Sequence, residues 1–100
     1  MRYNMHMIFV RKLVWDKANI EHIARHGVTP VEVEEVCVAD SFILYGHSGR
    51  TMIVGPTKKG RALSIVLDPE IEEGVWYPVT ARPADRKERK LYKEEKGVNL

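Results

Sequence analysis

The chain has 100 residues, 44% of them hydrophobic and 30% charged, which is typical of one soluble domain with a single core. Its 16 basic and 14 acidic residues give a net charge of +2, which neither requires nor excludes a nucleic-acid partner. The one cysteine, Cys37, excludes an internal disulfide framework and suits the cytoplasm. No apolar run reaches the ~20 residues that a membrane helix needs. We expect a single cytoplasmic domain over residues 1–100, in which residues 1–10 form an N-terminal extension or supply an extra strand.

The charges are unevenly distributed along the chain. Residues 28–49 contain four acidic side chains and no Lys or Arg, whereas residues 1–27 and 82–100 each carry a net charge of +3. If the two ends meet in space, they form a basic face.

Two helices are predicted in the first half. Asp16 is a suitable N-cap for a helix from Lys17 to about His26, and Gly27 suits its end. We expect that helix to pack through a stripe formed by Ile20, Ile23 and Ala24.

The second helix is predicted from the capping box Thr29-Pro30-Val31-Glu32. Its buried side is expected to comprise Val33, Val36 and Cys37. The cysteine is therefore interpreted as a packing residue rather than a reactive one.

The middle of the chain predicts an antiparallel meander. Strands are expected at residues 41–45, 50–55, 61–68 and 75–81, joined by short turns that include 46–49 and 57–60. In the third strand Leu63, Ile65 and Leu67 alternate with Ala62, Ser64 and Val66. Pro78 has no amide hydrogen, so its strand should lie at an edge or contain a bulge. Residues 8–15 are a further candidate strand.

A last helix is predicted from the N-cap Asp85 to about Lys96, before Gly97. Leu91 and Tyr92 are its only sizeable apolar residues, so we expect weak docking and a solvated basic surface, or one that a partner covers. The predicted fold class is α+β, with two N-terminal helices, an antiparallel sheet of three to four strands and a C-terminal basic helix.

A histidine-containing face is the first candidate for chemistry. Asn19, His22 and His26 share one side of the first helix, and the two histidines have the spacing of a zinc pair. No third ligand is evident in the sequence, so we predict neither a metal site nor a cofactor. His22 is interpreted as a packing residue. His26 is either a general acid or base or a residue that packs near the helix end, where it also suits the negative end of the helix dipole.

A basic cluster is the second candidate. Arg82 ends the last strand, and five cations follow it on the helix: Arg86, Lys87, Arg89, Lys90 and Lys93. The planar guanidinium group binds phosphate through two parallel bonds, as a surface that holds a nucleic-acid backbone requires. Arg50 and Arg61 are added because both begin strands after turns. The alternative is a solvated helix whose glutamates pair with its lysines.

Two segments together resemble the BrnT-type toxins, the small ribonucleases of bacterial type II toxin–antitoxin pairs. The first contains Leu13-Val14-Trp15-Asp16, Asn19 and Ala24-Arg25-His26-Gly27-Val28. The second runs from Thr80 to Tyr92 and contains the signature Ala-Arg-x-Ala-x-Arg-x-Glu-Arg-x-x-Tyr. The ordered set covers about residues 13–94.

This resemblance implies a RelE-like fold, metal-independent RNA cleavage that blocks translation, and a BrnA-like DNA-binding antitoxin encoded beside the chain. RNA and that antitoxin are the expected partners, in homo- or hetero-oligomers. We assign catalysis to His26 as acid or base and to Arg82 and Arg61 at the phosphate, all three facing one cleft. Arg50, Arg86 and Arg89 would bind flanking phosphates. Glu88 is a candidate base, but capping explains it.

Two other functions fit the same residues. One is a non-catalytic small basic module that binds RNA or a partner protein. The other is a regulatory or structural subunit with no role on nucleic acid.

Overall fold

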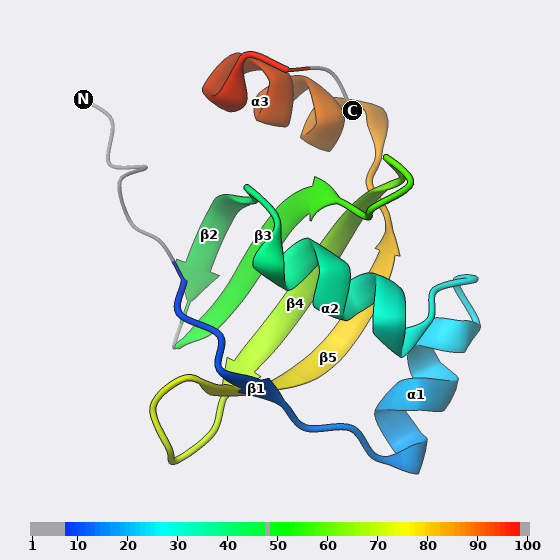
Figure 1. Cartoon of the computed structure of the whole chain (residues 1–100), viewed down its shortest axis with the longest axis vertical. Helices are drawn as coiled ribbons and strands as arrows, with labels where there is room; N and C mark the ends of the chain where they lie inside the picture. Colours follow the sequence, from blue (N-terminus) through cyan, green and yellow to red (C-terminus); the bar gives the residue numbers. More distant parts are fainter. Residues whose placement is uncertain (1–7, 48, 99–100) are drawn as a thin grey trace.

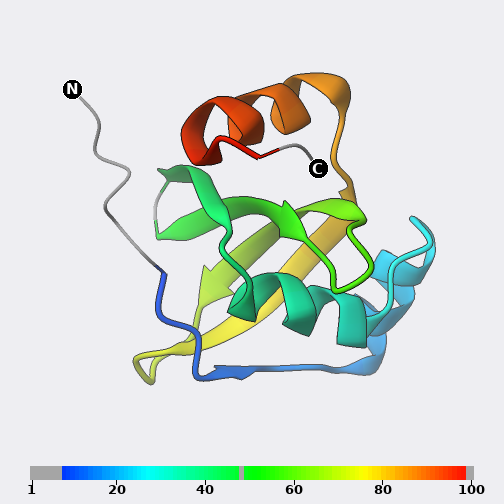
Figure 2. The same cartoon turned by 45° about the horizontal axis from the view of Figure 1, so that its top comes forward.

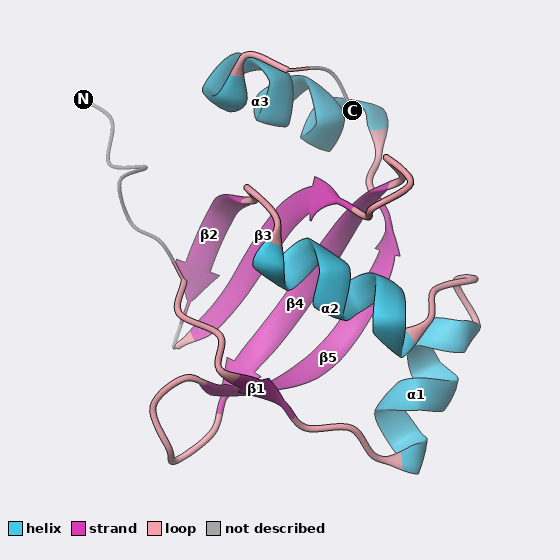
Figure 3. Ribbon diagram, viewed as in Figure 1, coloured by secondary structure: helices cyan, strands magenta, loops and turns pink. Residues whose placement is uncertain are grey.

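The computed structural model describes residues 8–47 and 49–98, which form a five-stranded sheet and three helices (Figure 1, Figure 3). In chain order the elements are β1 Lys12–Leu13, α1 Lys17–Ala24, α2 Pro30–Val38, β2 Phe42–His47, β3 Arg50–Pro56, β4 Ala62–Pro69, β5 Val75–Pro83 and α3 Arg86–Lys96. The predicted α+β class is confirmed. Residues 1–7, which belong to the possible extension, and Ser48, which belongs to the predicted turn at 46–49, lie outside the described residues.

The sheet has the strand order β1-β5-β4-β3-β2. Strands β2 to β5 form the predicted antiparallel meander. The candidate strand at residues 8–15 is confirmed in a short form: Lys12 and Leu13 pair in parallel with Val75 and Trp76. The sheet is therefore mixed, with five strands where the sequence predicted three or four antiparallel ones.

One face of the sheet carries the main core, which α2 covers (Figure 1). The predicted alternation in β4 is confirmed, because Leu63, Ile65 and Leu67 are all fully buried on this face. From the helical side come Ile23, Val28, Val33 and Val36. Cys37 packs against this core as predicted, and burial, with the charge of Glu34, raises its pKa to about 12.

The predicted stripe of α1 is wrong in two of its three positions. Ile23 is buried, but Ile20 is 39% exposed and Ala24 is also exposed. The helix buries Asn19 instead, whose Nδ2 donates to the carbonyl oxygens of Val14 and Pro78 at 2.9 and 3.1 Å. Burying an amide is favourable here because it satisfies backbone acceptors that would otherwise lack donors.

Strand β1 pairs with β5 only at Val75 and Trp76, so at Pro78 the β1 side of β5 has no neighbouring strand among the described residues. The register between β4 and β5 shifts next to it, between Val66 and Leu67. The predicted bulge is therefore confirmed.

The third helix packs on the other face, near one end of the sheet (Figure 2). Tyr92 is only 3% exposed and contacts Val54 and Ala84 in a second, smaller cluster. Its hydroxyl donates to the carbonyl oxygen of Asp40 at 2.8 Å. The sequence predicted weak docking of this helix. Among the described residues of α3, Tyr92 is the one apolar side chain that is buried.

Candidate functional site

Arg82 lies near the end of β5, where the chain turns into α3. In the sheet it is paired with Ser64 of β4. Ser64 and Val54 are neighbours across the strands, and Val54 belongs to the cluster under α3, so Arg82 lies on the α3 face. The start of α3 is fixed by a capping box in which Asp85 and Glu88 each accept from the backbone amide of the other.

Glu88 joins this cap to the sheet. The carboxylate accepts two hydrogen bonds from Arg82, Nη1 to Oε1 at 2.9 Å and Nη2 to Oε2 at 2.7 Å. Ser64 Oγ donates to Oε1 at 2.7 Å. The side chain of Glu88 is 9% exposed, whereas that of Arg82 is 38% exposed. We call Ser64, Arg82, Asp85 and Glu88 the Arg82 network.

The pKa of Glu88 shows what this network can do. Burial opposes ionisation, but the hydrogen bonds from Arg82, Ser64 and the Asp85 amide, together with the charge of Arg82, lower the pKa to about 2. So acidic a carboxyl is a weak base, and both of its oxygens already accept hydrogen bonds. Glu88 is thus suited to orienting Arg82 and capping α3, and poorly suited to removing a proton.

Exposed cations continue from Arg82 along α3. Together with Arg82 they define the α3 basic surface: Arg86, Lys87, Arg89, Lys90 and Lys93. The guanidinium group of Arg89 donates to the carbonyl oxygen of Ala84 at 2.7 Å, which holds it near the start of the helix. Lys96 does not belong to this surface, because it pairs with Asp40 at 2.8 Å. The surface is a row of cations beside one pre-oriented arginine.

Arg61 lies at the same end of the sheet but on the α2 face. Its Nη1 donates to both oxygens of Glu32, at 3.0 and 2.9 Å, and to the carbonyl oxygen of Gly27 at 2.9 Å. Burial of Glu32 opposes ionisation, but the bonds from the Thr29 amide and Arg61 lower its pKa. Arg61 therefore ties the turn between α1 and α2 to the start of β4.

His26 is exposed in that same turn, next to Gly27. Its ring lies edge-to-face against that of His22, with the ring centroids 5.7 Å apart. The structure thus brings His26 near the residues that Arg61 contacts. Since Arg61 and Arg82 point to opposite faces of the sheet, the three predicted catalytic residues do not line one cleft. Among the described residues no group of three or more His, Cys, Asp or Glu side chains is placed to hold a metal.

Arg50 begins β3 at the far end of the sheet. It binds Asp68 through two hydrogen bonds, Nε to Oδ1 at 2.7 Å and Nη2 to Oδ2 at 2.9 Å. Asp68 is four residues along β4 from Ser64, roughly 13 Å at the usual rise of a strand. Arg50 is therefore separate from the Arg82 network, whereas Arg86 and Arg89 adjoin it.

Sequence reasoning missed Ser64 and the pairing of Glu88 with Arg82. The alternation puts Ser64 on the side of its strand opposite Leu63, Ile65 and Leu67, but nothing in the sequence indicates that a helix covers it there. Glu88 was recognised as a capping residue, and that role is confirmed. Its second role depends on the register of β4 with β5, which brings Ser64 opposite Arg82.

Comparisons with models of known families, with curated proteins and with solved structures find no match to this chain. Within residues 8–47 and 49–98, no helix has the length and apolar character needed to cross a membrane.

Proposed function

We propose that the chain is the toxin of a type II toxin–antitoxin pair and a metal-independent endoribonuclease that blocks translation. The observation that supports this proposal is the Arg82 network, in which a half-exposed guanidinium is held by a bidentate carboxylate beside the cations of α3. The motifs that resemble the BrnT-type toxins include both Arg82 and Glu88.

The proposed chemistry is attack of a ribose 2′-hydroxyl on the adjacent phosphorus, which forms a 2′,3′-cyclic phosphate as the bond to the 5′-oxygen of the next nucleotide breaks. A general base takes the proton of the attacking hydroxyl, and a general acid protonates the departing 5′-oxygen. Arg82 would stabilise the charge that develops on the phosphoryl oxygens. Arg86 and Arg89 would hold flanking phosphates, because contacts to phosphate fix the position of the strand. His26 would serve as the general acid or base. It lies near the residues that Arg61 contacts and not near Arg82, so His26→Ala tests its role separately.

Growth and RNA cleavage test this proposal together. The wild type and Arg82→Ala are expressed at equal levels without any antitoxin, and the purified proteins are assayed on RNA with a chelator present. We expect the wild type to arrest growth and cleave RNA, and Arg82→Ala to lose about 10²–10³-fold in rate. Arg11→Ala is the matched control, because it removes an exposed arginine whose partner is Glu72, outside the candidate site. Equal growth of the wild-type and Arg82→Ala strains, with RNA intact in both, would exclude ribonuclease activity.

His26→Ala measures the second candidate. A loss of about 10²–10⁴-fold would show that His26 transfers a proton. An unchanged rate would remove His26 from the mechanism, in agreement with its position on the side opposite Arg82.

A non-catalytic module that binds RNA is the second candidate function. It is favoured by the failure of His26, Arg61 and Arg82 to converge, since binding needs only the α3 basic surface. In that case affinity for RNA should fall steeply with salt, because bound phosphates release counterions. Arg86→Ala/Arg89→Ala should flatten this dependence while RNA remains intact.

The expected protein partner is a BrnA-like DNA-binding antitoxin, which would form hetero-oligomers with the chain. The reading frame next to this gene should encode it. Co-expression of that protein should restore growth, and its failure to do so would separate this chain from toxin–antitoxin pairs.

A further inference from the structure

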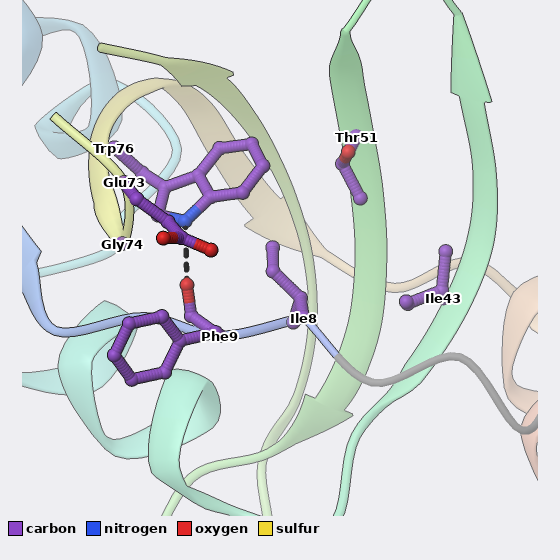
Figure 4. Close-up of a pocket in the computed structure, with 7 residues that line it drawn as sticks. All are labelled: Ile8, Phe9, Ile43, Thr51, Glu73, Gly74 and Trp76. Atoms are coloured by element: carbon purple, nitrogen blue, oxygen red, sulfur yellow. Dashed lines mark hydrogen bonds between the residues drawn. The ribbon is translucent and has the colours of Figure 1, made fainter. Parts of the chain in front are cut away.

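A pocket of about 340 Å³ lies at the end of the sheet away from α3 (Figure 4). It is lined by Ile8, Phe9, Ile43, Thr51, Glu73, Gly74 and Trp76. These residues come from the segment before β1, from β2, β3 and β5, and from the loop that precedes β5. None of them belongs to the Arg82 network or to the α3 basic surface.

The aromatic side of the pocket is held by specific contacts. The indole Nε1 of Trp76 donates to the carbonyl oxygen of Phe9 at 2.8 Å, which fixes the indole ring. Phe9 lies against Gly74, where an added Cβ would come within 2.6 Å of its ring. Gly74 also has φ +85°, a backbone conformation that glycine adopts without strain. The indole of Trp76 is therefore held in place before any ligand arrives, and the Phe9 ring lies over Gly74 beside it.

The charged side of the pocket is acidic and unneutralised. Glu73 is exposed, and among the described residues its carboxylate has no hydrogen-bond or ion-pair partner. Arg11 binds the Gly74 carbonyl through its own backbone amide, but its guanidinium pairs with Glu72 at 3.3 Å. Among residues 8–47 and 49–98, no basic residue lines the pocket. The combination of a fixed indole and an unpaired carboxylate is complementary to an organic cation.

We propose that this pocket binds an arginine side chain of a partner polypeptide. The guanidinium group is planar, stacks on aromatic rings and pairs with a carboxylate through two bonds, which fits Trp76 and Glu73 together. Its three methylene groups would lie against Ile8 and Ile43. Phe9, which is 60% exposed, and Glu73 form the rim, so the side chain enters while its main chain stays outside. This site does not depend on the proposed action on RNA.

Titration of the full chain with N-acetyl-arginine amide tests the proposal, followed by NMR of the backbone amides and the two indole groups. Trp15→Phe assigns the indole signal of Trp76, since the chain has only these two tryptophans. We expect saturable shifts at Trp76, Gly74 and Thr51. N-acetyl-citrulline amide has nearly the same shape without the charge, and it should cause little shift.

Glu73→Gln separates the charge from the shape of the site. We expect it to weaken binding by about two- to fivefold, as the loss of an exposed ion pair implies. Glu70→Gln is the control, because Glu70 is an exposed acid of the same loop that does not line the pocket. It should leave the affinity unchanged.

Three results would overturn the proposal. The first is equal binding of the arginine and citrulline amides, and the second is equal affinity of Glu73→Gln and the wild type. The third is a large gain in affinity for the arginine amide in Arg2→Gln. That gain would mean that Arg2 of the same chain competes for the pocket, so that the occupant is not a partner polypeptide. RNA cleavage by Glu73→Gln should equal that of the wild type, so this test stands or fails apart from the proposed function.

Discussion

The two faces of the sheet hold their helices by different means. Against β4, α2 packs through Val33 and Val36, which are fully buried among aliphatic side chains. In contrast, α3 packs through Tyr92 and through the ionised Glu88, which is buried only because it is hydrogen-bonded on both oxygens. Apolar contact tolerates small shifts of a helix, whereas a bidentate ion pair fixes position and angle. On the α3 face the ion pair that holds the helix therefore also orients Arg82, beside the exposed cations of α3.

Removal of a core side chain from the α2 face should have the largest effect. Ile65→Ala should lower the free energy of unfolding by about 2–5 kcal/mol, since it leaves a cavity in a fully buried cluster. Val66→Ala is the neighbouring control on the opposite face, where the side chain is only half-buried. Urea unfolding followed by circular dichroism measures both, and similar losses would contradict the assignment of the faces.

Breaking the Arg82 network should come next. Glu88→Ala should lower the free energy of unfolding by about 1–3 kcal/mol, because Arg82 and Ser64 lose their acceptor. Hydrogen exchange should rise across α3 and stay low in α2. Glu94→Ala, an exposed acid of the same helix, should change neither quantity. Uniform loosening of both helices would mean that the network stabilises the whole domain.

Acid should reveal the same difference between the faces. The pKa of Glu88 is about 2 in the folded chain, below its ordinary value of 4.5, so its ion pair contributes to stability fully above pH 4.5. That contribution is lost as the pH falls from about 4.5 towards 2. Glu88→Gln should remove this part of the pH dependence, as unfolding curves over that range would show. Asp68→Asn removes another carboxyl of lowered pKa, in its pair with Arg50 at the far end, and should leave hydrogen exchange in α3 unchanged.

The smallest effects are expected at the capping boxes of α2 and α3. Thr29→Ala and Asp85→Ala should each cost about 0.5–2 kcal/mol, because each removes the acceptor for an amide in the first turn of its helix. Asp85→Ala should also alter RNA binding, since it loosens the turn that carries Glu88. Thr29→Ala should not. Equal RNA affinity of the two variants would separate the α3 cap from the candidate site.

The sequence predicts the features that neighbouring residues determine, and it fails for those that depend on contacts between distant parts of the chain. Caps at Asp16, Thr29 and Asp85, and alternation in β4, follow from the chemistry of neighbouring residues, and all are confirmed. The inward turn of Asn19 is not local, because its acceptor on Pro78 is 59 residues away. The expected convergence of Arg61 and Arg82 fails for a similar reason. The register of β5 with β4 pairs Arg82 with Ser64, on the face opposite the one where Arg61 meets Glu32.

The short strand β1 has a consequence for how the domain forms. Strands β2 to β5 are joined by hairpins, so their pairing closes only short loops, whereas Lys12 meets Val75 across more than half of the chain. Closing so long a loop is slow relative to hairpin formation, and the strand that it pairs is only two residues long, with flanking bonds from the amides of Arg11 and Val14. We therefore expect β1 to dock last and to open first. Its opening would uncover Leu13 and its neighbours in the main core while the meander stays intact.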